Sequence, residues 1–235
     1  MSSSTNDNLA VLIDADNAQA SPIQELLEEV SRYGTANVKR AYGDWSSPQL
    51  KKWTAELLAH AIKPQQQFAY TKGKNATDSA LIIDAMDLLH TGNLNGFCLV
   101  SSDSDFTPLA TRIRESGLKV YGFGERKTPQ AFVAACDKFI YTEILTPQKA
   151  KPAKGKPQGP SPKKKLLEAV DIAAQDDGWA NLGTVGSMLI KNDPAFDSRN
   201  YGFKKLVELV KKQPYLEIKK VKIESGGSTI LVRIR

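Results

Sequence analysis

The stretch GFCLVSSDSDFTPLA, residues 96–110, runs from apolar residues through two carboxylates into a helical pattern. Residues 96–102 open with the uninterrupted apolar run that is typical of a strand buried on both faces. After Asp105 the apolar residues recur at the spacing of an amphipathic helix. Asp103 and Asp105 therefore lie at a strand-to-helix junction, and in open parallel sheets that edge forms the ligand-binding crevice.

Four further strand–helix pairs surround this one along the first part of the chain. The expected strands are 9–14, 36–44, 65–70, 96–102 and 118–124, and the expected helices are 21–34, 47–62, 77–90, 105–117 and 128–137. Parallel strands need crossover connections, and these connections pack back onto the sheet as helices. The alternation therefore predicts an α/β fold in which helices sandwich a parallel sheet.

Three separate segments bring carboxylates to the same edge of that sheet. These carboxylates belong to Asp14 and Asp16 after the first strand, Asp78 before the third helix, and Asp103 and Asp105 after the fourth strand. Like charges at close range oppose one another's ionisation, so a cation would relieve the conflict. Oxygen ligands without Cys or His nearby favour a hard divalent ion, Mg²⁺ or Mn²⁺.

Helix capping is the structural alternative for two of these residues. Asp78 and Asp105 each stand where a helix is expected to begin, and Asp is a common N-cap. Capping alone does not explain why Asp14, Asp78 and Asp103 reach one edge together. The sequence therefore favours a metal site and leaves Asp105 open as either a ligand or a cap.

Other folds with a carboxylate after the first strand fit less well. A haloacid-dehalogenase-type phosphatase needs a Ser or Thr at the end of the second strand, where this chain has AYGDW, residues 41–45. A response-regulator receiver ends its fifth strand with a lysine, whereas here that strand ends in YGFG. A dinucleotide-binding domain needs GxGxxG after the first strand, and this chain has none there.

A change in composition divides the chain. Residues 146–165 contain five prolines and seven lysines without apolar periodicity, which is typical of an extended linker. Up to residue 145 there are 14 Lys and Arg against 17 Asp and Glu, and beyond it there are 18 against 9. We expect a flexible N-terminus (1–8), an α/β domain (9–145), a linker (146–163) and a basic domain (164–235). The basic domain favours a polyanion partner, with nucleic acid ahead of an anionic membrane surface.

The basic domain has the pattern of three helices and a hairpin, which predicts a winged helix. The expected helices are 164–175, 182–192 and 198–213, and strands 215–224 and 228–235 flank a glycine turn. Trp179 and Phe196 are expected to fill its core. The third helix carries Arg199, Lys204, Lys205, Lys211 and Lys212, and the first strand carries Lys219, Lys220 and Lys222. These cations are expected to meet phosphates, the alternative being an evenly solvated basic face.

Ordered motifs in both parts resemble known families. IDADN, KNATDSALIIDAMDLL, GFCLVSSDSDFTPLATRIRE, KVYGFGERKTPQAF and CDKFIY resemble the NYN domain, a branch of the PIN-like nucleases, and more narrowly its LabA-like or DUF88 group. The order GWANLGTVGSMLIKNDPAFDSRNYGFKKLVELVKKQPYLEI resembles the OST-HTH or LOTUS domain. The first resemblance implies a PIN-like sheet and metal-dependent ribonuclease activity. The second implies binding of RNA and of protein partners.

The resemblance also implies roles for residues. Metal would be held by Asp14, Asp78, Asp103 and Asp105, and a ligand water or phosphate would be oriented by Asn17. Contact with substrate is further expected of Ser102, Lys72, Lys74, Arg199, Lys204 and Lys205. Many relatives have Gly where this chain has Ser102.

We therefore expect a metal-dependent ribonuclease whose basic domain captures RNA and raises its local concentration. The leading alternative is a non-catalytic RNA-binding adaptor, and a metal-dependent phosphatase is third. No run of 18 apolar residues and no basic, apolar leader is found in the sequence, so we expect a cytoplasmic protein without membrane partners.

Overall fold

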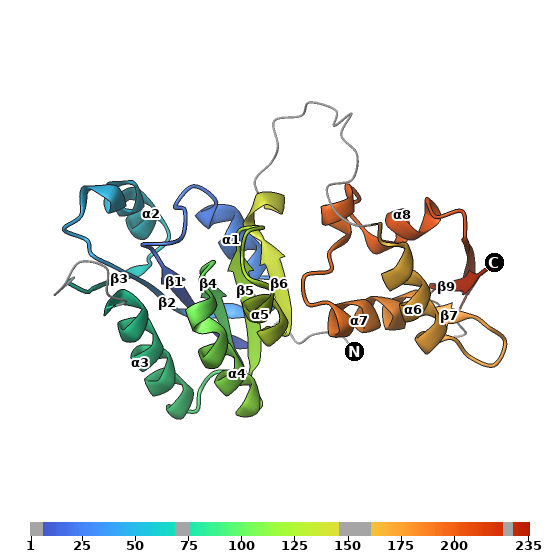
Figure 1. The fold of residues 1–235 in the computed structure, drawn as a ribbon, viewed down its shortest axis with the longest axis horizontal. Coiled ribbons are helices and arrows are strands. Elements are labelled where there is room, and N and C mark those ends of the chain that lie inside the picture. Colours follow the sequence, from blue (N-terminus) through green and yellow to red (C-terminus); the bar gives the residue numbers. More distant parts are fainter. Residues whose placement is uncertain (1–6, 69–75, 146–160, 223–227) are drawn as a thin grey trace. The chain divides into compact units, whose positions relative to one another are not determined.

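The computed structural model describes residues 7–68, 76–145, 161–222 and 228–235 (Figure 1). The chain divides into two compact units, Met1–Pro147 and Gln148–Arg235. Lys72 and Lys74, the hairpin turn, and most of the expected N-terminal and linker segments lie outside the described residues.

The first unit contains six parallel strands in the order β3-β2-β1-β4-β5-β6 (Figure 1). Their bounds are β1 Asn8–Asp14, β2 Thr35–Gly43, β3 Lys63–Gln66, β4 Gly96–Val100, β5 Lys119–Gly124 and β6 Lys138–Tyr141. β1 pairs with β2 on one side and with β4 on the other, so the strand order reverses beside β1. The carboxyl ends of β1 and β4 meet there, since Ile13 is the register partner of Val100. This switch point is where open parallel sheets bind ligands.

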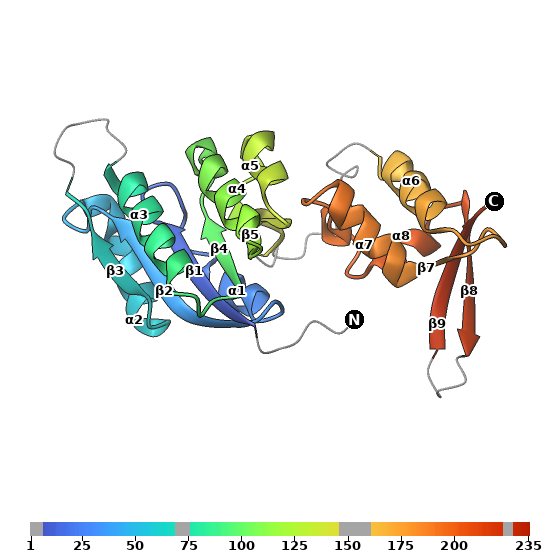
Figure 2. The ribbon, with the colours of Figure 1, turned by 90° about the horizontal axis from the view of Figure 1, so that it is seen from below.

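Helices cover both faces of the sheet (Figure 2). One face carries α1 Ile23–Val30 and α2 Trp53–Ala59, and the other carries α3 Ala76–His90, α4 Thr107–Glu115 and α5 Gln130–Ala135. All but the first residue of β1 are buried, because its alternate side chains enter the two helical layers in turn. The predicted α/β class and the sandwiched parallel sheet are confirmed.

Two strands of this unit differ from the sequence prediction. β3 ends at Gln66, short of the predicted 65–70, and β6 was not predicted as a strand. β6 is four residues long and follows α5 after only two residues, so its own sequence gives little periodic signal. Its pairing with β5 is what defines it as a strand.

The second unit packs helices against a three-stranded antiparallel sheet in the order β7-β9-β8. Its elements are α6 Lys163–Ala173, β7 Ala180–Asn181, α7 Leu182–Asn192, the 3-10 turn η4 Ser198–Tyr201, α8 Leu206–Lys211, β8 Leu216–Lys222 and β9 Ser228–Ile234. The single helix predicted over 198–213 is wrong, because Gly202 adopts a φ of +83° and separates η4 from α8. Phe196 lies in the core as predicted, whereas Trp179 is half-buried and outside that core.

Candidate active site

Asp14 is the last residue of β1, and its side chain is completely buried at the switch point. Its Oδ2 accepts hydrogen bonds from Ser101 Oγ at 2.7 Å and from Asn17 Nδ2 at 3.0 Å. Its Oδ1 accepts the backbone amide of Asn17 at 3.3 Å. Burial raises the pKa of Asp14, and these hydrogen bonds oppose the rise because they stabilise the ionised form. The carboxylate is therefore held in one orientation from two neighbouring strand ends.

Asp78 lies in the first turn of α3 and is 8% exposed. Burial is the first cause that raises the pKa of Asp78 to about 6, and repulsion from the surrounding carboxylates is the second. Those carboxylates belong to Asp14, Asp103, Asp105 and Asp16. The start of α3 is tied to the loop after β1, because Thr77 Oγ1 donates to Asp16 Oδ2 at 2.7 Å. The fold thus brings the carboxylates of all three segments within electrostatic range of one another.

Asp103, and not Asp105, caps the helical turn after β4. Asp103 is the N-cap of η2, Ser104–Phe106, and its Oδ1 accepts the amide of Asp105 at 2.9 Å. Asp105 lies inside that turn with an exposed side chain, and α4 begins two residues later. The interpretation of Asp105 as a helix cap is therefore wrong. Asp103 combines a capping role with its position beside Asp78.

Ser101 takes part in this site although it was not among the predicted site residues. It is 3% exposed and directly follows β4. Its hydroxyl donates to Asp14 and accepts the backbone amide of Asp103 at 3.1 Å, so it links two of the carboxylate-bearing segments. The available signal was its position in the sequence, because Ser101 lies at the end of a predicted strand, at the sheet edge where Asp14 was also expected.

The residues at this edge fit a divalent cation in donor type and in charge. All the clustered side chains offer oxygen, which suits Mg²⁺ or Mn²⁺. Within the described ranges, no three His, Cys, Asp or Glu side chains already stand as a metal-binding group. Burial and then the neighbouring carboxylates raise the pKa of Asp78, and a cation at this edge would favour its ionised form. Cys98 and Cys136 are buried, and burial raises both thiol pKa values, which suits core packing better than ligation.

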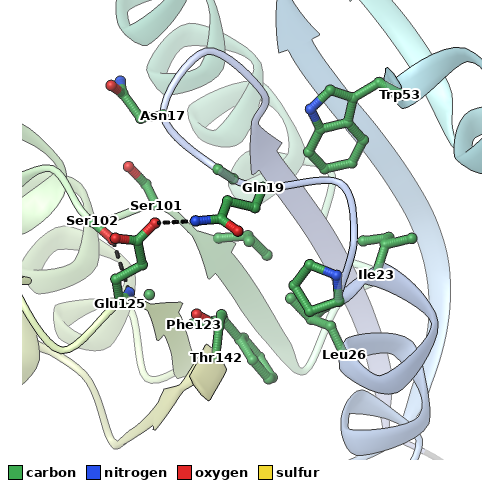
Figure 3. A pocket seen from close by; sticks show the side chains of 14 residues that line it. Asn17, Gln19, Ile23, Leu26, Trp53, Ser101, Ser102, Phe123, Glu125 and Thr142 are labelled. Carbon is green, nitrogen blue, oxygen red and sulfur yellow. Dashed lines mark hydrogen bonds between the residues drawn. The ribbon is translucent and has the colours of Figure 1, made fainter. Parts of the chain in front are cut away.

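A small pocket lies where β4 and β5 end and where the chain leaves β1 (Figure 3). Asn17 and Ser101, which both donate hydrogen bonds to Asp14, are among the residues that line it. Across it, Gln19 Nε2 donates to Glu125 Oε1 at 3.1 Å, and Ser102 Oγ accepts the amide of Glu125 at 2.9 Å. Ser102 thus holds the loop after β5 in place. The substrate contacts expected of Asn17 and Ser102 stay predictions.

The predicted RNA-contacting cations of the second unit fall into two groups. Arg199 forms a bidentate pair with Asp197, donating from Nε at 3.0 Å and from Nη2 at 2.7 Å, and its side chain is 22% exposed. Lys204 and Lys205 stand exposed between η4 and α8. The two lysines are therefore better placed than Arg199 to meet a polyanion.

The fold and the site together define a PIN-like α/β domain with carboxylates at its switch point, joined to a small helical domain with a three-stranded sheet. The chain belongs to the NYN domain family, whose model matches residues 8–145. The OST-HTH/LOTUS domain model matches residues 160–226. NYN domains belong to a nuclease superfamily whose members generally use divalent metals, and OST-HTH/LOTUS domains imply RNA binding.

Three solved structures are similar to portions of the chain. A protein of unknown function from Vibrio parahaemolyticus is 20% identical with a TM-score of 0.49, and the match covers 59% of this chain and 94% of that one. Proteins from Nitrosomonas europaea and Chromobacterium violaceum are each 34% identical, with TM-scores of 0.30 and 0.28, over 38% of this chain and 92% and 88% of theirs. A search of curated proteins gave no match. In the described part of the chain, no helix is both long and apolar enough to cross a membrane.

Proposed function

We propose that this chain is a Mg²⁺- or Mn²⁺-dependent ribonuclease that hydrolyses RNA phosphodiester bonds, and that its C-terminal domain recruits the RNA. The observation that carries the proposal is the convergence of Asp14, Asp78 and Asp103 from three segments at the switch point. Burial and repulsion from the neighbouring carboxylates both disfavour the ionised form of Asp78, and a bound cation would offset both effects. Membership of the NYN family supports the same reading.

Asp14, Asp78 and Asp103 would hold the cation, with Asp105 as a further ligand on the exposed side. A bound divalent cation activates water and stabilises the departing oxygen in phosphodiester hydrolysis. The hydrogen bonds from Ser101 and Asn17 favour the ionised form of Asp14 and fix the direction of its carboxylate. This arrangement places fixed negative charge at a rigid sheet edge, as a preorganised site requires.

The C-terminal domain would bind the RNA, and the N-terminal domain would cleave it. Lys204 and Lys205 are exposed, and the chain beyond residue 145 has twice as many basic as acidic residues, 18 against 9. Two tethered modules raise the effective concentration of a shared ligand without any new contact. RNA held by the second domain would therefore reach the acidic site more often.

The proposal is tested by incubating the full-length protein with labelled single-stranded RNA, structured RNA and a small phosphoester, in Mn²⁺ or in EDTA. RNA cleavage that requires metal is expected. RNA that is bound but never cut would indicate an adaptor, and turnover of the small ester alone would indicate a phosphatase.

Asp103→Asn tests the site itself. An Asn retains an oxygen that can accept the Asp105 amide, so the fold should survive while metal-dependent cleavage is lost. Asp87→Asn, on the exposed face of α3, is the matched control. A fully active Asp103→Asn protein would contradict the proposal.

A further inference from the structure

Trp179, the tryptophan of the second unit, lies outside the hydrophobic core of that unit. It lies in the turn between α6 and β7, directly after Gly178, whose φ is +76°. Its side chain is half-buried, and it does not belong to the hydrophobic core of the domain. Asp177 Oδ1 accepts its backbone amide at 3.0 Å, which fixes the turn that presents it.

Strand register defines the surface on which the ring lies, here called the outer face. Glu217 pairs with Arg233, and Lys219 pairs with Leu231, so these four residues share one side of the β8–β9 ladder. The opposite side carries the core residues Leu216, Ile218, Ile230 and Val232. Figure 2 shows α6, α7 and α8 together on one side of β8 and β9. The outer face is the side that these helices do not cover.

Two cations of the outer face lie against the Trp179 ring. The guanidinium carbon of Arg233 is 4.6 Å from the ring centroid, and Lys219 Nζ is 5.3 Å from it. The Arg233 side chain also runs past Gly178, where a β-carbon would meet its Cδ at 3.5 Å. Glu217 Oε2 accepts Arg233 Nη2 at 2.7 Å, which positions the guanidinium beside the ring. Nucleobases stack on aromatic rings and on guanidinium planes, and the half-buried Trp179 ring lies beside such a guanidinium.

We propose that the outer face binds single-stranded RNA, with a base stacked on the Trp179–Arg233 pair and neighbouring phosphates on Lys219 and Arg233. The inference rests on the proposed function only in taking RNA as the ligand. On the outer face RNA would be bound through its bases as well as its phosphates, whereas Lys204 and Lys205 offer phosphate contacts alone. Lys220 and Lys222 are exposed on the same strand, but the register places them on the opposite side of the ladder from Lys219, so they are not part of the outer face.

The basic strands favour an anionic occupant, and the Trp179 ring favours RNA over an acidic peptide. Glu217 is the one acidic residue within β8 and β9, and it is already paired with Arg233. Asp176 and Asp177 are exposed in the turn before the ring and would repel phosphates, so the RNA backbone should run over Lys219 and away from that turn. An acidic peptide would use the cations but gain nothing specific from an aromatic platform.

The decisive experiment compares base-dependent with charge-dependent binding in the full-length protein. Fluorescence anisotropy in EDTA measures affinity for a labelled single-stranded RNA and for a sugar-phosphate oligomer of equal length without bases. Trp179→Ala should weaken RNA binding about 5- to 150-fold, the range expected for loss of one stacked base. Trp179→Phe should restore most of the affinity, and the abasic oligomer should bind both variants like the wild type. Unchanged RNA binding, or an equal loss for both ligands, would overturn the proposal.

The salt dependence of RNA binding tests the proposed phosphate contact of Lys219 separately. Lys219→Gln should reduce the slope of log affinity against log salt by about 0.7, as expected for one phosphate contact to a single strand. Lys191→Gln, an exposed lysine at the end of α7, is the matched control and should leave the slope unchanged. A slope that Lys219→Gln does not alter would remove Lys219 from the RNA path.

A measurement on the wild-type chain covers the case in which Trp179→Ala does not fold. Photocrosslinking with an RNA that contains 4-thiouridine, followed by peptide mapping, should label Trp179 or strands β8 and β9. Crosslinks confined to the segment around Lys204 and Lys205 would overturn the proposal. Both measurements are made without cleavage, so failure of the nuclease proposal and failure of this one give different results.

Discussion

The two domains of this chain use charge in opposite ways. In the N-terminal domain Asp14 is fully buried and Asp78 is 8% exposed, and both have raised pKa values. In the C-terminal domain Lys204, Lys205 and Lys219 are exposed to solvent. Buried charges interact strongly and over fixed directions, whereas exposed charges act through a screened, longer-range field. We therefore assign RNA cleavage to the buried carboxylates and RNA binding to the exposed cations. Four substitutions test that division.

The largest effect is expected from Asp78→Asn. Loss of this carboxylate should lower the RNA cleavage rate by about 10²- to 10³-fold, the loss typical of removing one group that stabilises developing charge. RNA affinity in EDTA should not fall, because the variant only removes negative charge near the substrate. Rates and affinities are measured by gel assay and anisotropy, with Asp87→Asn as the control. An Asp78→Asn protein that binds RNA weakly but cleaves it at the wild-type rate once saturated would show that Asp78 serves in binding and not in cleavage.

Ser101→Ala tests whether the hydrogen bonds beneath the carboxylates are needed. The change removes the donor to Asp14 and the acceptor for the Asp103 amide. Cleavage should fall by about 10- to 100-fold, the usual cost of losing a partner that orients a metal ligand. Ser104→Ala, in the same loop but exposed, serves as the control. Equal cleavage by the Ser101→Ala and Ser104→Ala proteins would show that Asp14 needs no such support.

The double change Lys204→Gln with Lys205→Gln addresses the exposed charges. RNA affinity should fall, and the slope of log affinity against log salt should decrease by about 0.7 for each lysine that meets a phosphate. The cleavage rate at saturating protein should stay at the wild-type value. If the rate at saturation falls instead, the lysines act in the chemical step and the division between the domains fails.

The smallest effect concerns stability and pH. Asp78 has a pKa of about 6 in the fold against the ordinary value of 3.8, so the fold favours the protonated form. The metal-free protein should therefore gain stability as pH falls through about 6, and its ionised Asp78 should cost stability above that pH. Asp78→Asn should raise the free energy of unfolding by about 1–2 kcal/mol at pH 7.5 and by less at pH 4.5. Chemical denaturation in EDTA measures this, and a gain that is equal at both pH values would contradict it.

Much of the N-terminal fold was predictable because its signals are local and repeated. Four of the six strands of the sheet follow from the alternation of strand patterns with amphipathic helices, and β1 and β4 lie as predicted beside the carboxylates. β3, with the sequence KPQQ, overlaps its predicted range only at residues 65 and 66. β6 was not predicted, because a four-residue strand is defined by its pairing with β5 more than by its own sequence pattern. The capping role of Asp103 was not predicted, because a short 3-10 turn precedes α4. The capping residue is therefore Asp103, two residues closer to β4 than Asp105.

Several features of the C-terminal domain differ from what its sequence predicted. A basic amphipathic pattern over 198–213 predicted one helix, but Gly202 in the left-handed region divides it, and Lys204 and Lys205 fall in the connection. Arg199 was predicted to meet phosphates, yet the structure pairs it with Asp197. Trp179 was predicted as core, because residue type favours burial, but the turn after Gly178 carries it to the outer face of the sheet. In each case the backbone turn decides where the side chain lies.

The most direct test of the central claim is single-turnover cleavage of a labelled RNA measured against protein concentration in Mn²⁺. The rate at saturation reports the chemical step, and the concentration that gives half of it reports RNA capture. Asp78→Asn should lower the saturating rate and leave the half-saturating concentration near the wild-type value, while Trp179→Ala should do the reverse. A wild-type protein that never cuts RNA, or an Asp78→Asn protein that cuts at the wild-type rate, would contradict the account.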